Sequence, residues 1–363
     1  MIKRVKIIGA GSIGNHLAHA SRRLGWDVVV CDISPDALER MQKSIYPQRY
    51  GQWDAAIALS LLDEAPAGGF DLICIGTPPE HHIPLTVAAA AEAPRAIQVE
   101  KPLCPPALAD ADETFRRLES DGVRGFVGYD HVVGKAARRL VEMLGEGEIG
   151  EVVTFDVEFR EHWRGIFNAH PWLDGPQSSY LGYWRRGGGA SGEHSHAANF
   201  WQFLAHSTGH GRVTEVSASL RYVRDGRVDY DDCCFLDLRT ETGMIGRVVQ
   251  DVVTEPVRKS AFIQGTKGQL TWVNGYNAKG DAVILDRVGR DSLVQELPKT
   301  RPDDFIDELA HIDASLESGS GSPLDLVRGL ETMLVVAAAH RSADERRAIR
   351  LDYAAGYSPA ALQ

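Results

Sequence analysis

Segments rich in apolar residues alternate with amphipathic segments over the first third of the chain. The segments rich in apolar residues predict short strands over residues 5–8, 27–31 and 70–75. Helical periodicity follows in residues 15–24 and 84–91. Because strands alternate with helices, we expect a doubly wound parallel sheet of the α/β class with right-handed crossovers.

After residue 126 the pattern changes to a two-residue alternation of apolar and polar side chains. It predicts strands over residues 152–159, 214–220, 233–238, 245–253, 260–264 and 269–273. We therefore expect an α/β domain over 1–126, an α+β domain with an open, mainly antiparallel sheet over 127–322, and a returning C-terminal helix and tail over 323–363.

A glycine motif joins the first predicted strand to the first predicted helix. Gly9, Gly11 and Gly14 form GxGxxG, with Ser12 and Ile13 before the last glycine. The first glycine permits a tight turn, the second lets the backbone approach a diphosphate, and the third lets helix and strand pack closely. Because the N–H groups at the helix start would face phosphates, the motif predicts an NAD(P)-binding Rossmann domain.

Asp32 ends the second predicted strand. A carboxylate at this place can accept both ribose hydroxyls of the adenosine and would repel a 2′-phosphate. The sequence therefore favours NAD over NADP. An alternative is that Asp32 only caps a helix opened by Ser34-Pro35-Asp36.

Two polar segments follow later predicted strands. Thr77-Pro78, with His82 four residues beyond the proline, follows one strand, and Glu100-Lys101-Pro102 follows the next. Loops at the carboxyl ends of parallel strands are where such sheets bind ligands. We expect Thr77, Pro78, His82, Glu100 and Lys101 to contact the cofactor.

These motifs, in this order and at these separations, resemble the glucose-fructose oxidoreductase and inositol dehydrogenase family, Gfo/Idh/MocA. Gly187-Gly188-Gly189, followed by Glu193 and His196, is similar to the glycine, acid and histidine segment of that family. His170-Pro171-Trp172 and Ser179-Tyr180 are similar to a subgroup of sugar and nucleotide-sugar oxidoreductases.

The resemblance covers nearly the whole chain. It implies an NAD(H)-dependent oxidoreductase that acts on a hydroxyl or keto carbon of a sugar, cyclitol or nucleotide sugar. The open sheet in this family commonly packs on a second subunit, which implies a homodimer or homotetramer. The usual aspartate is Glu193 here, and the aspartate often found three residues past the histidine is Asn199, so the reach or charge of these groups is altered.

Oxidation of a carbinol needs a base near the hydroxyl and a group that stabilises the developing alkoxide. Lys101 suits the stabilising role, and His196 suits the base because an imidazole titrates near neutral pH. Glu193, three residues before His196, is expected on the same helical face and could orient the imidazole or the substrate hydroxyl. His194 is expected to point away from that face and to be structural or substrate-lining, so it receives no catalytic role.

Each of these assignments has an alternative. Lys101 could pair only with Glu100 or with the cofactor phosphates, and His196 could be a hydrogen-bonded residue of the core. A metal site would need both His194 and His196, but residues two apart on a helix lie roughly 200° apart. Zinc motifs on helices place the histidines four apart instead, so no metal is predicted.

Aromatic and basic side chains are dense over residues 162–186. Aromatic faces stack on sugar rings, and Arg forks bind carboxylate or phosphate. For any single residue, the alternative is a surface loop that closes the dimer. The candidate substrate-binding residues are Lys101, Arg164, His170, Trp172, Tyr180, Glu193, His196 and Asn199.

Composition excludes several other classes of protein. The formal net charge of -11 argues against a general nucleic-acid binder, which needs a basic footprint. No apolar run is long enough to span a membrane, and no signal-peptide pattern precedes the first strand. The five cysteines form no CxxC pair, so we expect a reduced, cytoplasmic protein.

Two functions of other kinds stay open. The same fold with bound NAD can serve a glycosidase that oxidises its substrate transiently, eliminates the leaving group and reduces the product again. It can also serve a non-catalytic regulator that senses NAD or a sugar, which Lys101 and His196 argue against.

Overall fold

The N-terminal part of the chain forms a parallel sheet. The computed structural model describes residues 1–168, 170 and 172–363. Six strands lie in the order β3-β2-β1-β4-β5-β6, and all pairs are parallel. They are β1 (Arg4–Ile8), β2 (Asp27–Asp32), β3 (Ile57–Leu61), β4 (Leu72–Ile75), β5 (Ala96–Val99) and β6 (Arg124–Val127). The strand order reverses between β1 and β4, where doubly wound sheets open a ligand crevice.

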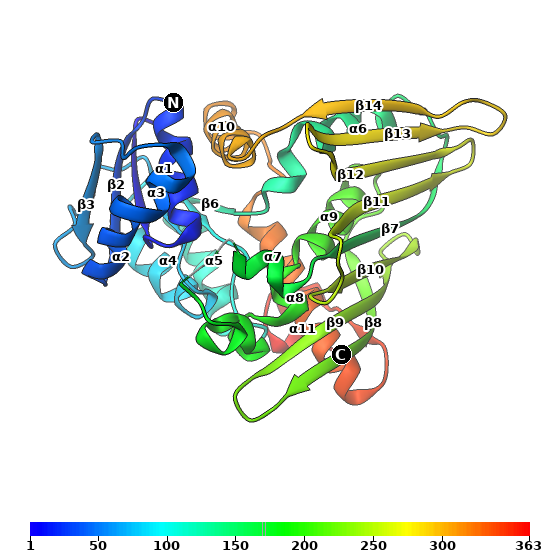
Figure 1. Ribbon diagram of the computed structural model, residues 1–363. Helices are drawn as coiled ribbons and strands as arrows, with labels where there is room; N and C mark the ends of the chain where they lie inside the picture. The colour runs from blue at the N-terminus through cyan, green and yellow to red at the C-terminus, as the bar shows by residue number, and fades with distance from the viewer. Residues whose placement is uncertain (169, 171) are drawn as a thin grey trace.

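Helices cover both faces of this sheet (Figure 1). They include α1 (Ser12–Arg23), α2 (Pro35–Arg40), α3 (Tyr46–Tyr50), α4 (His82–Ala90) and α5 (Ala111–Ser120), with a π-helical turn η1 (Met41–Ile45) between α2 and α3. α10 (Asp303–Ser318) joins them from much later in the chain. It packs against α1, where the rings of His16 and Phe305 stack with centroids 4.7 Å apart.

The second sheet is open and mainly antiparallel, as the alternation predicts. Its order is β14-β13-β12-β11-β7-β10-β9-β8-β15, and among the strands of the described residues only β7 and β10 pair in parallel. The strands are β7 (Val152–Arg160), β8 (Val213–Arg224), β9 (Asp229–Thr240), β10 (Ile245–Asp251), β11 (Arg258–Gly265), β12 (Gln269–Asn277), β13 (Gly280–Asp286), β14 (Leu293–Pro298) and β15 (Ile349–Arg350). The two-domain fold class is confirmed, whereas the exact boundaries at 126 and 322 remain predictions.

One face of the second sheet is covered by helices that lie toward the first sheet (Figure 1). The buried side chains of β7 are Phe155, Val157 and Phe159, and alternate residues point the other way. The helices are α6 (Lys135–Gly145), α7 (Trp163–Asn168), α8 (Gly189–Glu193), α9 (His196–Ser207) and α11 (Leu326–Glu345). Short 3-10 turns are η2 (Pro79–His81), η3 (Asp130–Val133), η4 (Pro176–Ser178), η5 (Tyr180–Gly182), η6 (Trp184–Arg186), η7 (Tyr353–Ala355) and η8 (Pro359–Ala361).

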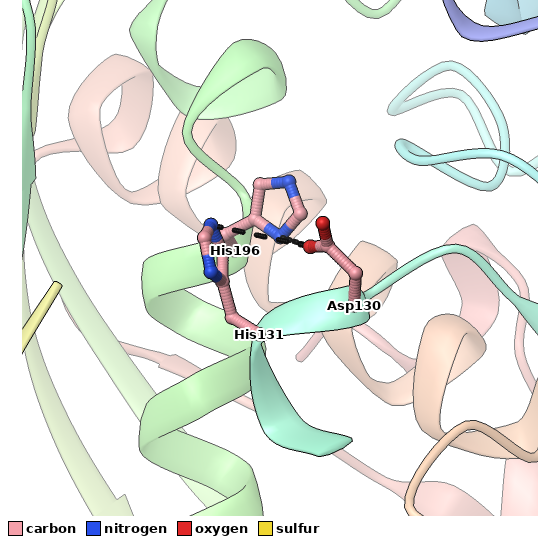
Figure 2. Close-up of side chains that lie close together, drawn as sticks. All are labelled: Asp130, His131 and His196. Atoms are coloured by element: carbon pink, nitrogen blue, oxygen red, sulfur yellow. Dashed lines mark ion pairs between the residues drawn. The ribbon is translucent and has the colours of Figure 1, made fainter. Parts of the chain in front are cut away.

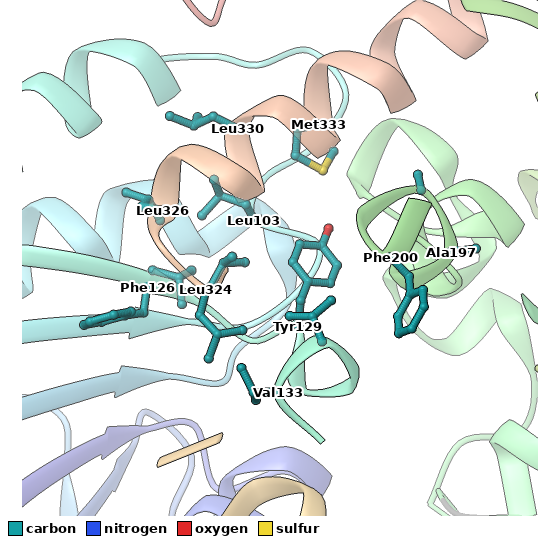
Figure 3. Close-up of a cluster of buried hydrophobic side chains, with 14 of the residues drawn as sticks. Leu103, Phe126, Tyr129, Val133, Ala197, Phe200, Leu324, Leu326, Leu330 and Met333 are labelled. Carbon is teal, nitrogen blue, oxygen red and sulfur yellow. The ribbon is translucent and has the colours of Figure 1, made fainter. Parts of the chain in front are cut away.

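A buried hydrophobic cluster joins the two sheets (Figure 3). It contains Phe126 from β6, Tyr129 from the following loop, Phe200 from α9 and Met333 from α11, all fully buried. The same cluster therefore fixes the end of β6 relative to the start of α9. Among the described residues, no helix is long and apolar enough to cross a membrane.

Candidate active site

One cavity of about 540 Å³ lies between the parallel sheet and the helices that face it. Ser12 and Ile13 of the glycine loop line one end, and Lys101, Glu193 and His196 line its interior. Its other lining residues include His16, Arg49, Tyr50, Glu100, Asp130, His131, Glu161, His170, Trp172, His194, Lys259, Arg301 and Phe305. The cavity thus connects the expected cofactor loop with all three predicted catalytic residues.

The glycine loop has the geometry that a dinucleotide needs. Gly9 has a φ of +110°, and a Cβ on Gly14 would lie 1.9 Å from the carbonyl oxygen of Gly9, so side chains do not fit there. A Cβ on Gly11 would meet nothing within 4 Å, so its backbone is open to a ligand. Because α1 begins at Ser12, its first N–H groups are available to a diphosphate, and the loop fits NAD.

Asp32 lies at the end of β2 beside the glycine loop. Its Oδ2 accepts a hydrogen bond from the Ala10 N–H at 2.8 Å, and its Oδ1 accepts one from the Ser34 N–H at 2.9 Å. The N-cap of α2 is Ser34, whose side chain accepts from the Ala37 N–H. The helix therefore has its own cap, and the ribose role of Asp32 remains a prediction.

His82 lies behind the cofactor loops and does not line the cavity. One ring nitrogen, Nε2, is 2.7 Å from the Thr77 carbonyl oxygen, and the other, Nδ1, is 3.0 Å from that of Pro102. Burial lowers the pKa of His82 to about 4, so the ring is neutral at neutral pH. His82 ties the Thr77-Pro78 loop to the loop that follows Lys101, so any effect on the cofactor acts through those loops.

Glu100 lies at the bottom of the cavity in a group of buried carboxyls. The side-chain amide of Gln98 donates to Glu100 Oε1 and to Glu308 Oε1, each at 3.0 Å. Burial and the nearby Asp130 raise the pKa of Glu100 to about 7. Lys101 directly follows Glu100 in the sequence and is therefore the cation nearest in sequence to these buried carboxyls.

Lys101 and Glu193 form a direct pair. Lys101 Nζ donates to the main-chain oxygen of Glu193 at 2.9 Å and to its Oε2 at 3.1 Å. Burial opposes ionisation of Glu193, but the charges of Lys101 and His194 outweigh it and lower the pKa of Glu193. Glu193 is therefore an ionised partner of Lys101 that holds its ammonium in the cavity.

Glu193 and His196 do not share one helix, so the prediction that they share a helical face is wrong. α8 ends at Glu193, α9 begins at His196, and His194 lies between them. Asp231 anchors α8 by accepting bonds from the N–H and Oγ of Ser191. α9 is instead held by its own contacts with β7, so the chain turns between the two helices.

His194 lines the cavity, as a structural or substrate-lining residue would. The expectation that it points away from Glu193 and His196 is wrong, because all three side chains line this cavity. Burial lowers the pKa of His194 to about 4. Its Nε2 is buried without a hydrogen-bond partner among the described residues.

Two residues that the sequence reasoning missed lie beside His196 (Figure 2). Asp130 Oδ1 is 3.8 Å from His196 Nδ1 and 4.0 Å from His131 Nε2. All three side chains offer atoms within 4.8 Å of one another, which is also a possible arrangement for a metal ion. Asp130 and His131 lie three and four residues after the end of β6, so the rule that selected Thr77 and Lys101 could have found them.

The structure divides the predicted substrate residues. His170 and Trp172 line the cavity, and Pro171 lies outside the described residues. Arg164 is exposed and pairs with Glu255 at 3.2 Å, on the outside of α7.

Tyr180 and Asn199 also lie outside the cavity lining. Tyr180 begins η5 and packs against the core. Asn199 faces α11, where its Nδ2 donates to Thr332 Oγ1 at 3.1 Å, because α9 turns this position away from the cavity. Arg164 and Asn199 are therefore not brought together with Lys101, whereas Tyr180 is buried within electrostatic reach of Glu193 and Glu100, and its substrate contact stays a prediction.

Two family models match the chain. A model described as an oxidoreductase family with an NAD-binding Rossmann fold matches residues 3–129. A model of the GFO/IDH/MocA C-terminal domain matches residues 137–271. A comparison with curated proteins found no match.

Several solved structures share the fold over nearly their full length. An oxidoreductase from Agrobacterium radiobacter, in complex with NAD+, L-tartaric acid and magnesium, is 21% identical with a TM-score of 0.76, covering 96% of this chain and 98% of that one. The WlbA dehydrogenase from Bordetella pertussis, in complex with NADH and UDP-GlcNAcA, is 22% identical with a TM-score of 0.70, covering 97% and 99%. A levoglucosan dehydrogenase in complex with NADH is 18% identical with a TM-score of 0.77, covering 96% and 98%.

Proposed function

Because the chain belongs to the Gfo/Idh/MocA family of NAD-binding oxidoreductases, we propose that it moves hydride between NAD and a hydroxyl or keto carbon of a sugar, cyclitol or nucleotide sugar. One observation carries this proposal. The cavity that begins at Ser12 and Ile13 contains Lys101, Glu193 and His196. A cofactor on the glycine loop and a substrate at Lys101 would therefore share one enclosed space.

The chain's own residues supply the acid–base chemistry. Lys101 Nζ, held by Glu193, donates a hydrogen bond to the reacting oxygen and stabilises its developing negative charge. His196 accepts the proton of the substrate hydroxyl. Bound NAD+ supplies the hydride acceptor.

The cofactor preference and the substrate class follow from separate features. Asp32 at the end of β2 favours NAD, because its charge repels a 2′-phosphate. His170 and Trp172, with ring centroids 5.3 Å apart in an edge-on pair, give the cavity an aromatic wall suited to a sugar ring. Structures of the same fold that are named as a nucleotide-sugar complex and a levoglucosan dehydrogenase support this class.

The open face of the second sheet supports a homodimer or homotetramer. Phe235 on β9 and Phe262 on β11 are 41% and 42% exposed on the face without helices. Light scattering should show a dimer or larger for the wild type and a shift toward monomer for Phe262→Glu. The matched control is Val288→Glu, at a fully exposed loop position. A monomeric wild type would contradict this proposal.

The function is tested by a substrate screen. Purified protein with NAD+ is tested for NADH formation, measured by absorbance, across inositols, hexoses, uronates and nucleotide sugars. Net NADH from one compound class supports the proposal. Release of an aglycone from glycosides without net NADH would show a glycosidase, and binding without turnover of any kind would show a regulator.

A further inference from the structure

The carboxylate nearest to the predicted base belongs to Asp130 and not to Glu193. Asp130 Oδ1 is 3.8 Å from His196 Nδ1, while the Glu193 carboxylate is bound to Lys101. Figure 2 shows the Asp130 carboxylate and the His196 ring turned toward each other, from η3 and from the start of α9. The acid and the histidine thus come from chain segments more than sixty residues apart.

The two facing atoms lack partners. Asp130 Oδ1 and His196 Nδ1 are both buried, and neither has a hydrogen-bond partner among the described residues. A buried polar atom without a hydrogen bond costs about 1–3 kcal/mol. A movement of about 1 Å would bring the two atoms to hydrogen-bond distance and remove both costs at once.

Aromatic neighbours hold the imidazole in this orientation. Phe159 stacks on the His196 ring at 6.0 Å, and Tyr129 and His131 meet it edge-on at 5.4 and 4.7 Å. Tyr129 OH also lies 3.2 Å from Ser195 Oγ, which links the Asp130 segment to the start of α9. The ring therefore has little freedom to turn Nδ1 away from Asp130.

Charge, and not distance, favours a proton over a metal ion between these groups. Ligand atoms around zinc lie about 3.4 Å apart, and the 3.8 and 4.0 Å seen here would fit either arrangement after a small movement. Cations also face the cluster. The charged and titratable groups that act on Asp130 or His196 are Arg301, Lys299, Lys101, Lys259, Glu100, Glu308, His131 and His194.

We propose that Asp130 is the positioning residue of His196: its carboxylate accepts a hydrogen bond from Nδ1–H and leaves Nε2 as the proton acceptor. The inference rests on the proposed function. In the oxidation direction, the substrate O–H bond breaks and its proton goes to Nε2, while the carbinol hydrogen leaves with its electron pair as hydride to NAD+. The resulting imidazolium keeps its Nδ1–H bond to the Asp130 carboxylate, and this bond opposes burial, which lowers the pKa of His196 and raises the pKa of Asp130.

The test independent of turnover is the tautomer of His196. Nitrogen NMR of ¹⁵N-histidine protein distinguishes Nδ1–H from Nε2–H, and a His196→Gln variant assigns the signal among the 13 histidines. We expect Nδ1–H in the wild type, its loss in Asp130→Asn, and no change in Glu193→Gln. An Nε2–H tautomer in the wild type, or a change in Glu193→Gln with none in Asp130→Asn, would overturn the inference.

Kinetics give the second test. We expect Asp130→Asn to lower kcat about 10²-fold or more with KM changed less than about threefold. Without the carboxylate, the imidazolium is less stable, so the pKa of His196 falls and the acid limb of kcat/KM moves to lower pH. Asp130→Glu, whose extra methylene can span the gap, should recover most of the activity, and exposed Asp121→Asn should resemble the wild type.

The outcomes separate the two proposals. If the tautomer pattern is as expected but no substrate is oxidised, the proposed function fails and the positioning of His196 stands. If Asp130→Asn turns over normally with an unchanged pH profile, the inference fails and the function stands. Loss of activity on dialysis against EDTA, with recovery on adding Zn²⁺, would also overturn it, because His196 would then be a ligand.

Discussion

The loops of the parallel sheet and the helices that face them form the two sides of the cavity in different ways. On the sheet side, polar side chains are held by main-chain groups: Asp32 accepts from two N–H groups, and the neutral His82 ring lies between two carbonyl oxygens and donates its one N–H to one of them. On the helix side, ring nitrogens of His194 and His196 are buried without partners among the described residues. Thr77 Oγ1 and Asp130 Oδ1 on the sheet side are buried without partners in the described part of the chain as well, so the two sides differ in how Asp32 and His82 are tied to the main chain and not in whether hydrogen-bonding capacity is left over.

This difference shows where specificity can change. Groups fixed by the main chain need no reorganisation when NAD arrives, which keeps cofactor binding independent of the substrate. Unpartnered groups are available to a ligand or to a small shift of a neighbour. Lys101 belongs to both sides, because it follows β5 and its ammonium is bound by Glu193.

Lys101→Ala removes the ammonium group that joins the sheet side to Glu193 on the helix side, and we expect it to have the largest effect on turnover. We expect kcat to fall about 10³-fold or more, because the developing alkoxide loses its stabilising cation. NAD affinity, measured by fluorescence titration, should change less than about threefold. Lys3→Ala, at an exposed position, is the control, and turnover close to wild type in Lys101→Ala would refute the role.

Replacing His82 tests whether its buried ring on the sheet side of the cavity stabilises the folded protein. Burial lowers its pKa to about 4, while an unfolded histidine titrates near 6.5, so the unfolded state binds the proton first as pH falls. The contribution of His82 to the free energy of unfolding is fully present above pH 6.5. It decreases by about 3 kcal/mol as the pH falls toward 4.

Urea unfolding from pH 7.5 to 4.5 measures this contribution. His82→Gln should flatten the decline in the free energy of unfolding relative to the wild type. His81→Gln, at an exposed position, should leave the decline of the unfolding free energy with falling pH as it is in the wild type. Equal slopes in both variants would show that His82 gains a proton with little cost in the folded protein.

Glu193 tests how the helix side holds Lys101. Glu193→Gln removes the ion pair but keeps the main-chain contact, so we expect kcat to fall about 10- to 100-fold. Glu193→Asp keeps the charge with one methylene less, so its kcat should fall by a smaller factor than that of Glu193→Gln. Steady-state rates decide this, with exposed Glu146→Gln as control. A larger loss in the aspartate variant than in the glutamine variant would mean that length matters more than charge.

Asp32 should give the smallest effect, confined to the cofactor. Asp32→Ala removes the charge that repels a 2′-phosphate, so the ratio of kcat/KM for NAD to that for NADP should fall about 10-fold. Exposed Asp36→Ala should leave the ratio unchanged. A wild type that prefers NADP would show that Asp32 is not the determinant of cofactor choice.

The sequence was most informative where a local rule fixes the backbone. GxGxxG between strand and helix predicted the cofactor loop, and strand ends predicted Lys101, because both depend on a few adjacent residues. Asp130 and His131 follow the same rule after β6, but their relation to His196 depends on the cluster of Tyr129, Phe200 and Met333, which no short pattern encodes.

The helix side was less predictable for a physical reason. Spacing alone placed Glu193, His194 and His196 on one regular helix, yet α8, which Asp231 anchors at Ser191, ends at Glu193 and α9 begins at His196. The error affected the expected direction of His194 and the shared helical face of Glu193 and His196, although all three side chains line the cavity. Asn199 likewise faces Thr332 because α11 packs on α9, a contact from more than a hundred residues away.

The packing of α10 and α11 has a consequence for synthesis of the chain. α10 packs on α1, where Phe305 stacks on His16, and α11 lies against β6. The ribosome releases these helices only after every strand from β7 to β14. During translation, the nucleotide-binding sheet therefore lacks the α10 cover of α1 until residue 318 has emerged and the α11 cover of β6 until residue 345 has emerged.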